Sequence, residues 1–153
     1  MRIALDVNGE RHELDVPDTR RLADLLRDDL GLTGTKIGCA EGACGACAAL
    51  LDDRPVASCL VLAAAAVGHA VTTIEGISHG GTTALQEAFV AEDALQCGYC
   101  TPGQIVSATA LLRREAQPTR EQIHVAMAGN VCRCGAYPKI ERAILRASGQ
   151  AAT

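Results

Sequence analysis

The first stretch of the chain alternates between apolar and polar residues. The alternation runs over residues 3–7, is interrupted by Asn8-Gly9, and resumes over residues 12–16. An Asn-Gly pair between two alternating runs is typical of a β-hairpin with a two-residue turn, because both turn positions need a positive φ. We therefore predict a hairpin in this stretch.

A helical pattern follows the hairpin. Leucines recur at the spacing of one helix face between residues 22 and 30, and Gly31 is a suitable stop. Asp18 and Thr19 are residue types that cap the amino ends of helices. The pattern predicts one helix after the two strands.

The chain then passes through a stretch of glycines and cysteines before strand patterns return. Residues 48–51 and 55–58 flank an Asp-Asp turn and predict a second hairpin, and residues 70–74 predict a further β-branched strand. A mixed sheet packed on one helix is an α+β arrangement of the β-grasp type. The pattern does not give the strand order.

Three glycines within residues 75–81 indicate a linker, and the pattern beyond it is helical. We therefore divide the chain into an amino-terminal domain over residues 1–75, a linker over 76–81 and a carboxy-terminal domain over 82–153. Three threonines, each followed by glutamine at capping-box spacing, precede amphipathic runs: Thr83 with Gln86, Thr101 with Gln104, and Thr119 with Gln122. The predicted helices cover residues 83–92, 102–115, 120–128 and 138–147.

Composition and charge narrow the classes of function. The formal net charge is −4, and the basic residues are scattered rather than gathered in the stripe typical of nucleic-acid binders. An acid, Asp6, precedes any apolar run, so we expect no secretion signal, and the longest apolar run, residues 59–68, is too short to span a bilayer. We expect a cytoplasmic protein with no nucleic-acid partner and no membrane span, in a compartment where cysteines more often bind metals than form disulfides.

Four of the eight cysteines form a first set in the amino-terminal half, at Cys39, Cys44, Cys47 and Cys59. This is the plant-type ferredoxin spacing for a two-iron, two-sulfur (2Fe-2S) cluster, in which a loop must direct backbone N–H groups at sulfur. Glycines beside the cysteines, at positions 38, 42 and 45, allow such a loop. Zinc is the alternative, although four-thiolate zinc sites usually have two closely spaced cysteine pairs.

The other four cysteines form a second set at Cys97, Cys100, Cys132 and Cys134. This spacing is less diagnostic: it is compatible with zinc, and the Cys-x-x-Cys half alone also with a redox dithiol, though the βαβ context of that chemistry is missing. The iron-sulfur site predicted for the first set favours a second cluster here.

Three segments carry a resemblance to a known family. Residues 38–47, 96–103 and 129–137 resemble those of the small iron-sulfur subunit of the xanthine dehydrogenase and aldehyde oxidoreductase family of molybdenum hydroxylases, and all eight cysteines match. The resemblance extends over roughly residues 1 to 147. It implies a plant-ferredoxin-like domain followed by a four-helix domain, each with one 2Fe-2S cluster.

The same resemblance implies roles for single residues. The first set would hold the outer cluster and the second set the cluster nearest molybdenum, while Gln96 and Cys134 would also lie against the pterin of the molybdenum cofactor. The chain would belong to a hetero-oligomer with a large molybdenum-cofactor subunit and a medium subunit that often holds FAD. It would contribute no catalytic residue and would pass electrons from molybdenum to FAD or another acceptor.

Some residues near the cysteines have two interpretations. Arg133 could raise the potential of the inner cluster or could bind carbonyls or the partner chain. Tyr99 and Tyr137 fit packing over the clusters better than an electron path. The four histidines, at positions 12, 69, 79 and 124, are expected at the surface or in the linker rather than as iron ligands.

Three functions therefore remain in competition after the sequence analysis. The first is the electron-transfer subunit of a molybdenum hydroxylase. The others are a free-standing carrier similar to ferredoxin and a zinc-stabilised interaction module without redox function. The presence of two clusters separates the zinc module from the other two, and a bound large chain separates the subunit from the free carrier.

Overall fold

The alternating residues at the start of the chain form the predicted hairpin. In the computed structural model, which describes residues 1–78 and 80–151, β1 (Arg2–Val7) pairs antiparallel with β2 (Glu10–Asp15). Asn8 and Gly9 both have positive φ, 53° and 82°, as a type I′ turn requires.

The second predicted hairpin is also present, as β3 (Ala48–Leu51) and β4 (Arg54–Ala57). β5 (Ala70–Thr72) is shorter than the predicted strand, because a helix begins at Ile74. The sheet has the order β2-β1-β5-β3-β4, and β1 and β5 run parallel while the other neighbours are antiparallel. The sheet is therefore mixed, and the predicted α+β class is confirmed.

The leucine-rich helix packs on this sheet. It consists of α1 (Leu22–Asp24), which continues into the π-helical turn η1 (Leu25–Asp29), and its apolar face is fully buried with β1 residues in one cluster. Gly31 follows with a φ of 69°, which confirms it as the stop. A short 3₁₀ helix, η2 (Ala63–Ala66), precedes β5.

The prediction that Asp18 or Thr19 caps this helix was wrong. The N-cap residue is Arg21, and no side chain caps the helix. Backbone carbonyls take this role instead, because the N–H of Leu22 donates to Val61 at 2.7 Å and the N–H of Ala23 donates to Ser58 at 3.1 Å. The segment around Cys59, residues 58–61, thus satisfies the N–H groups at the start of the helix, and a local sequence signal could not reveal this.

The carboxy-terminal half contains the four predicted helices. They are α3 (Ala84–Ala91), α4 (Thr101–Arg114), α5 (Arg120–Met127) and α6 (Tyr137–Ala147). The capping boxes of α3 and α5, at Thr83 and Thr119, are both formed. The predicted box at Thr101 is not: Thr101 already belongs to α4, and the N-cap Cys100 has helical dihedral angles and no side-chain cap.

The predicted linker is partly helical. Residues Ile74–Ile77 form α2, and Ile77 is buried in the core of the helical half. His79 lies outside the described residues, and the limits 1–75, 76–81 and 82–153 stay a prediction.

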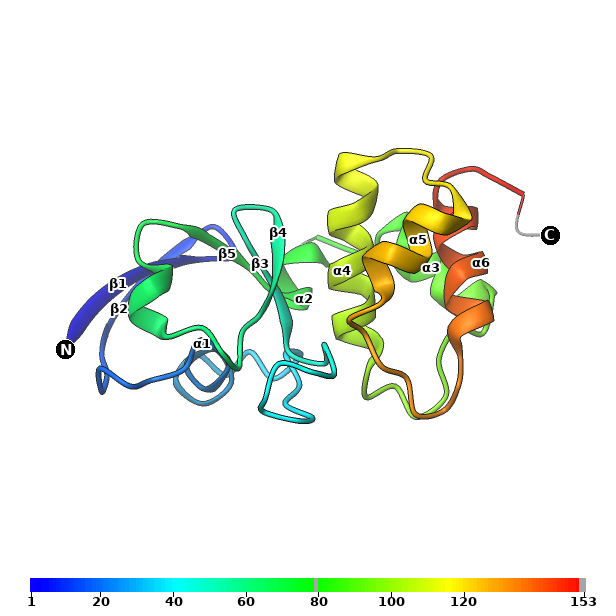
Figure 1. Ribbon diagram of the computed structural model, residues 1–153. Helices are drawn as coiled ribbons and strands as arrows, with labels where there is room; N and C mark the ends of the chain where they lie inside the picture. Colours follow the sequence, from blue (N-terminus) through cyan, green and yellow to red (C-terminus); the bar gives the residue numbers. More distant parts are fainter. Residues whose placement is uncertain (79, 152–153) are drawn as a thin grey trace.

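β3 belongs to two cores at once, because its side chains alternate between the two faces of the sheet. Ala49 packs with the leucines of α1 and η1, whereas Ala48 and Leu50 pack with the four-helix half. Figure 1 shows the result: α4 lies against the sheet, and the other three helices lie beyond it. The two halves therefore share an extensive contact. No helix among the described residues is long and apolar enough to cross a membrane.

Candidate metal centres

The first cysteine set lies in the loop between η1 and β3 and in the turn after β4. The loop takes positive φ at Ala40, Gly42 and Gly45, so that it curls around Cys39. Three backbone N–H groups donate to the Cys39 sulfur, from Glu41 at 3.5 Å, Ala43 at 3.3 Å and Cys44 at 3.4 Å. This is the arrangement predicted for a loop that directs N–H groups at sulfur.

The thiols of the first set form two neighbouring pairs. Cys39 interacts with Cys44, and Cys59 with Cys47. The N–H groups of Glu41 and Cys44 lower the pKa of the Cys39 thiol to about 7, whereas burial and the neighbouring Cys47 raise the pKa of the Cys59 thiol. The Cys39 thiol is thus easily ionised, whereas Cys47 and Cys59 are buried in the protein.

The four cysteines of the second set lie in the two loops that precede α4 and α6. Cys100 and Cys132 are neighbours, and Cys97 and Cys134 are exposed. Burial raises the pKa of the Cys100 thiol to about 11, and the nearby Cys132 adds to the shift. Burial acts to raise the pKa of the Cys132 thiol as well. The N–H of Ala136, 3.4 Å from its sulfur, acts in the opposite direction, and the pKa of Cys132 is lowered overall.

The thiols fit the donor set of two 2Fe-2S clusters. All eight are free thiols. Within residues 1–78 and 80–151, no three side chains of His, Cys, Asp or Glu are grouped to hold one metal ion. A two-iron cluster instead takes two thiolates on each iron and N–H donors around its sulfurs. In the first set, the two thiol pairs and the N–H groups at Cys39 match this arrangement. In the second set, the neighbouring thiols of Cys100 and Cys132 and the N–H group at Cys132 match part of it.

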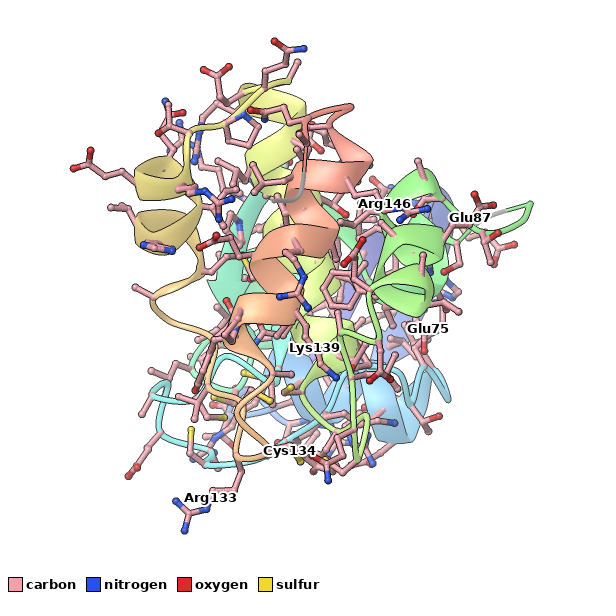
Figure 2. All side chains as sticks on the ribbon, turned by 90° about the vertical axis from the view of Figure 1, so that its right-hand side faces the viewer. Glu75, Glu87, Arg133, Cys134, Lys139 and Arg146 are labelled. Carbon is pink, nitrogen blue, oxygen red and sulfur yellow. The ribbon has the colours of Figure 1, made fainter. Side chains whose placement is uncertain are left out.

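Gln96 and Cys134 line one surface cavity of about 550 Å³, together with Asp93, Lys139 and Arg142. Both are exposed. In Figure 2, Cys134 lies at the end of the molecule where the chain enters α6, and Lys139 lies farther along that helix. The structure thus brings these two predicted site residues together on one face, although 38 positions separate them in the sequence.

Three hydrogen bonds join the two cysteine sets. The N–H of Val131 donates to the carbonyl of Cys44 at 2.9 Å, and Asn130 donates its side-chain amide to the carbonyl of Gly45 at 3.2 Å. The hydroxyl of Tyr99 donates to the carbonyl of Ile37 at 2.7 Å. Asn130 was not among the predicted site residues, and its place between Gly129 and the Cys132–Cys134 pair was the only local indication of this contact.

The two tyrosines next to cysteines have structural partners. Besides the Tyr99 contact, the hydroxyl of Tyr137 accepts the N–H of Cys132 at 2.8 Å. Both side chains remain half exposed. They hold the loops of the second set in place.

The charged residues near the cysteines differ in their surroundings. Arg133 extends away from the fold at the end marked by Cys134 (Figure 2). Of the histidines that the structure describes, His69 contacts Asp52 and His124 contacts Glu141, both at the surface, and His12 lies near Glu10. None of these three contacts involves a cysteine.

Two family models match the chain. A 2Fe-2S iron-sulfur cluster binding domain matches residues 5–69, and a [2Fe-2S] binding domain matches residues 73–145. The two models together cover both cysteine sets. The chain therefore has two 2Fe-2S binding domains.

Known proteins resemble the chain along nearly its full length. The nicotine 6-hydroxylase small subunit of Paenarthrobacter nicotinovorans is 47% identical over 98% of this chain and 91% of its own length. The nicotinate dehydrogenase small FeS subunit of Eubacterium barkeri is 47% identical over 93% of this chain and 91% of its own.

Solved structures agree with these relatives. A chain of quinoline 2-oxidoreductase from Pseudomonas putida 86 has a TM-score of 0.93 and 44% identity, with 99% of this chain and 95% of that chain covered. Aldehyde oxidoreductase from Desulfovibrio gigas has a TM-score of 0.91 and 39% identity over 97% of this chain, which corresponds to 17% of that longer chain. The chain belongs to the small iron-sulfur subunits of the xanthine dehydrogenase and aldehyde oxidoreductase family of molybdenum hydroxylases.

Proposed function

We propose that this chain is the electron-transfer subunit of a molybdenum hydroxylase and contributes no catalytic residue of its own. The observation that carries the proposal is that the loops of the two cysteine sets are in direct contact. The backbone N–H of Val131, next to the second set, donates to the carbonyl of Cys44 in the first set. Electrons would pass from a molybdenum cofactor in a large subunit, through both sets, to FAD in a medium subunit or to another acceptor. The direct contacts between the two cysteine loops support this role.

We assign the ligands by set. Cys39, Cys44, Cys47 and Cys59 would hold the outer cluster, and Cys97, Cys100, Cys132 and Cys134 the inner one. When bound, each 2Fe-2S cluster takes up and releases one electron at a time. The chain supplies the thiolates, the N–H donors at Cys39 and Cys132, and apolar packing that keeps water from the buried sulfurs.

The cavity lined by Gln96 and Cys134 would face the large subunit. Both side chains are exposed, so they are accessible to a group held by another chain. Gln96 has an amide that can donate and accept hydrogen bonds, as the edge of a pterin requires. Electrons would therefore enter beside Gln96 and leave near the loop of Cys39 to Cys47. The cytoplasmic location rests on the sequence alone and stays a prediction.

The test is the metal content and composition of the purified complex. We expect about four irons and four acid-labile sulfides per copy of this chain, two of each per cluster, and a co-purifying large chain. Zinc in place of iron, or iron for one cluster only, would contradict the proposal. Isolation of the chain as a stable monomer with both clusters and no large chain would favour the free carrier instead.

A further inference from the structure

Gln104 is a buried polar residue that the sequence analysis assigned only to a helix cap. The cap is not formed, and the side chain points into the protein from the first turn of α4, where it is 1% exposed. A buried amide without partners would cost about 1–3 kcal/mol, so its contacts have to be accounted for.

Gln104 contacts both halves of the second cysteine set. Its Nε2 donates to the carbonyl of Asn130 at 3.1 Å, two residues before Cys132. Cys100 has helical dihedral angles and lies four positions before Gln104, so the two side chains lie on the same face of the helix, and the backbone N–H of Gln104 donates to the carbonyl of Cys100 at 3.0 Å. Because a carbonyl can only accept, the contact with Asn130 fixes which end of the amide carries the donors.

The contact with Asn130 continues toward the first cysteine set. The side chain of Asn130 is nearly buried and donates to the carbonyl of Gly45, between Cys44 and Cys47. Gln104 therefore stands at the head of a buried hydrogen-bonded chain that runs from Cys100 to the loop of the first set.

We propose that Gln104 is a positioning residue that holds Cys100 and the Cys132 loop at their mutual spacing and raises the reduction potential of the inner cluster. A donor beside a ligand sulfur stabilises the reduced cluster, which carries one more negative charge than the oxidised one. The inference rests on the proposed function, because it takes the second cysteine set as the ligands of one cluster.

The experiment replaces Gln104 in the assembled complex and titrates both clusters by EPR-monitored reduction. Gln104→Met keeps the length of the side chain but removes its donors. We expect the potential of the inner cluster to fall and that of the outer cluster to stay unchanged. Ser107→Ala is the matched control, since Ser107 is buried one turn further along α4, and it should leave both potentials unchanged.

Gln104→Glu is the second variant, because it is isosteric but places a carboxyl group where the amide donors were. It should lower the inner potential as well, with both EPR signals present. An unchanged inner potential in either loaded variant would overturn the proposal. Failure of both variants to load the inner cluster would reduce Gln104 to a structural residue and would overturn the claim of tuning.

The proposed function is checked separately by the iron and sulfide content of the unaltered complex. If the wild-type complex holds two clusters and neither variant changes the potential of the inner cluster, only the role of Gln104 is rejected. A wild-type complex without the second cluster would reject the assignment of the site itself.

Discussion

The N–H of Val131 donates to the carbonyl of Cys44 at 2.9 Å, so a neighbour of the second cysteine set is bonded directly to a member of the first. Together with the contacts of Asn130 and Tyr99, this bond fixes the two cysteine loops against each other. Figure 1 shows these loops at the same end of the two halves. The relative position of the two sets is therefore a property of the fold. We call this contact between the two cysteine loops the seam, and changes at the seam should affect both sets.

The first prediction concerns Gly103, where α4 passes close to the loop of the first set. A Cβ at this position would lie 2.4 Å from the carbonyl oxygen of Gly45 and 3.2 Å from the Cα of Ala46. Both obstacles are backbone atoms, so Gly103→Ala must push the halves apart. We expect a loss of about 1–3 kcal/mol in unfolding free energy, seen as a lower thermal midpoint.

Gly129→Ala is the control for this change. A Cβ at Gly129 would meet nothing within 4 Å, although the residue lies in the same seam. The midpoint of this variant should stay near that of the wild type. Equal midpoints for Gly103→Ala and the wild type would show that the close approach does not constrain the seam.

The second prediction concerns the hydroxyl of Tyr99. Tyr99→Phe removes the bond to the carbonyl of Ile37, which joins the second set to the first, and should cost about 1 kcal/mol. Hydrogen exchange should become faster near residues 36–39. Tyr137→Phe removes a bond within the helical half and should leave exchange in that segment unchanged. The reverse result would contradict the role of Tyr99.

The sequence predicted most of the elements because their signals are local. The Asn8-Gly9 turn and the capping boxes at Thr83 and Thr119 depend on residues at most three positions apart, and all three are present. The missed features depend on distant partners. The first N–H groups of α1 donate to the carbonyls of Ser58 and Val61, and the residues around position 20 give no indication of these partners.

The candidate site also combines features with a local sequence signal and features that depend on distant residues. Cysteine spacing indicated two metal sites, because the ligands of a plant-type loop lie close in sequence. The seam between the sites could not be read in this way. Asn130 and Gly45 are 85 residues apart, and Gln104 carries a capping-box signal that the helical dihedral angles of Cys100 override.

The third prediction concerns Cys134 as a ligand of the inner cluster. Cys134→Ser should block electron delivery from the molybdenum site while the spectrum of the outer cluster stays in place. Turnover and EPR of the complex are the measurements. Cys39→Ser is the matched variant, since it should remove the outer signal instead. Unchanged turnover in Cys134→Ser would count against the assignment.

The fourth prediction concerns Glu92, which joins α3 to α6. Its carboxylate accepts from Arg142 at 3.2 Å and from Arg146 at 3.1 Å, and the hydrogen bond of Arg146, followed by that of Arg142, lowers its pKa. A lowered pKa stabilises the fold above the unfolded value and loses this effect as the pH falls through the folded value. Glu92→Gln should therefore lower the thermal midpoint at pH 7.

The difference between wild type and Glu92→Gln should shrink as the pH falls below the ordinary range of a glutamate and vanish below the folded pKa. Thermal melts across this pH range measure it. Glu87→Gln is the control, because Glu87 lies in α3 itself and its carboxylate accepts from the hydroxyl of the exposed Thr82 at 3.0 Å instead of from an arginine. A constant difference across the pH range would show that the ion pairs of Glu92 do not stabilise the fold.

The last prediction separates the two interpretations of Arg133. Arg133 extends into solvent and has no ion pair among the described residues, so water screens its charge from the neighbouring thiols in the isolated chain. We expect Arg133→Gln to weaken binding to the large subunit about fivefold, which corresponds to about 1 kcal/mol for one exposed ion pair. Arg114→Gln, at the opposite end of α4 from the cysteines, removes the same charge and should leave binding unchanged. Affinities of the two variants at low and high salt measure the effect, and the loss should be smaller at high salt. A lowered inner-cluster potential with unchanged affinity would instead favour Arg133 as a residue that tunes the cluster.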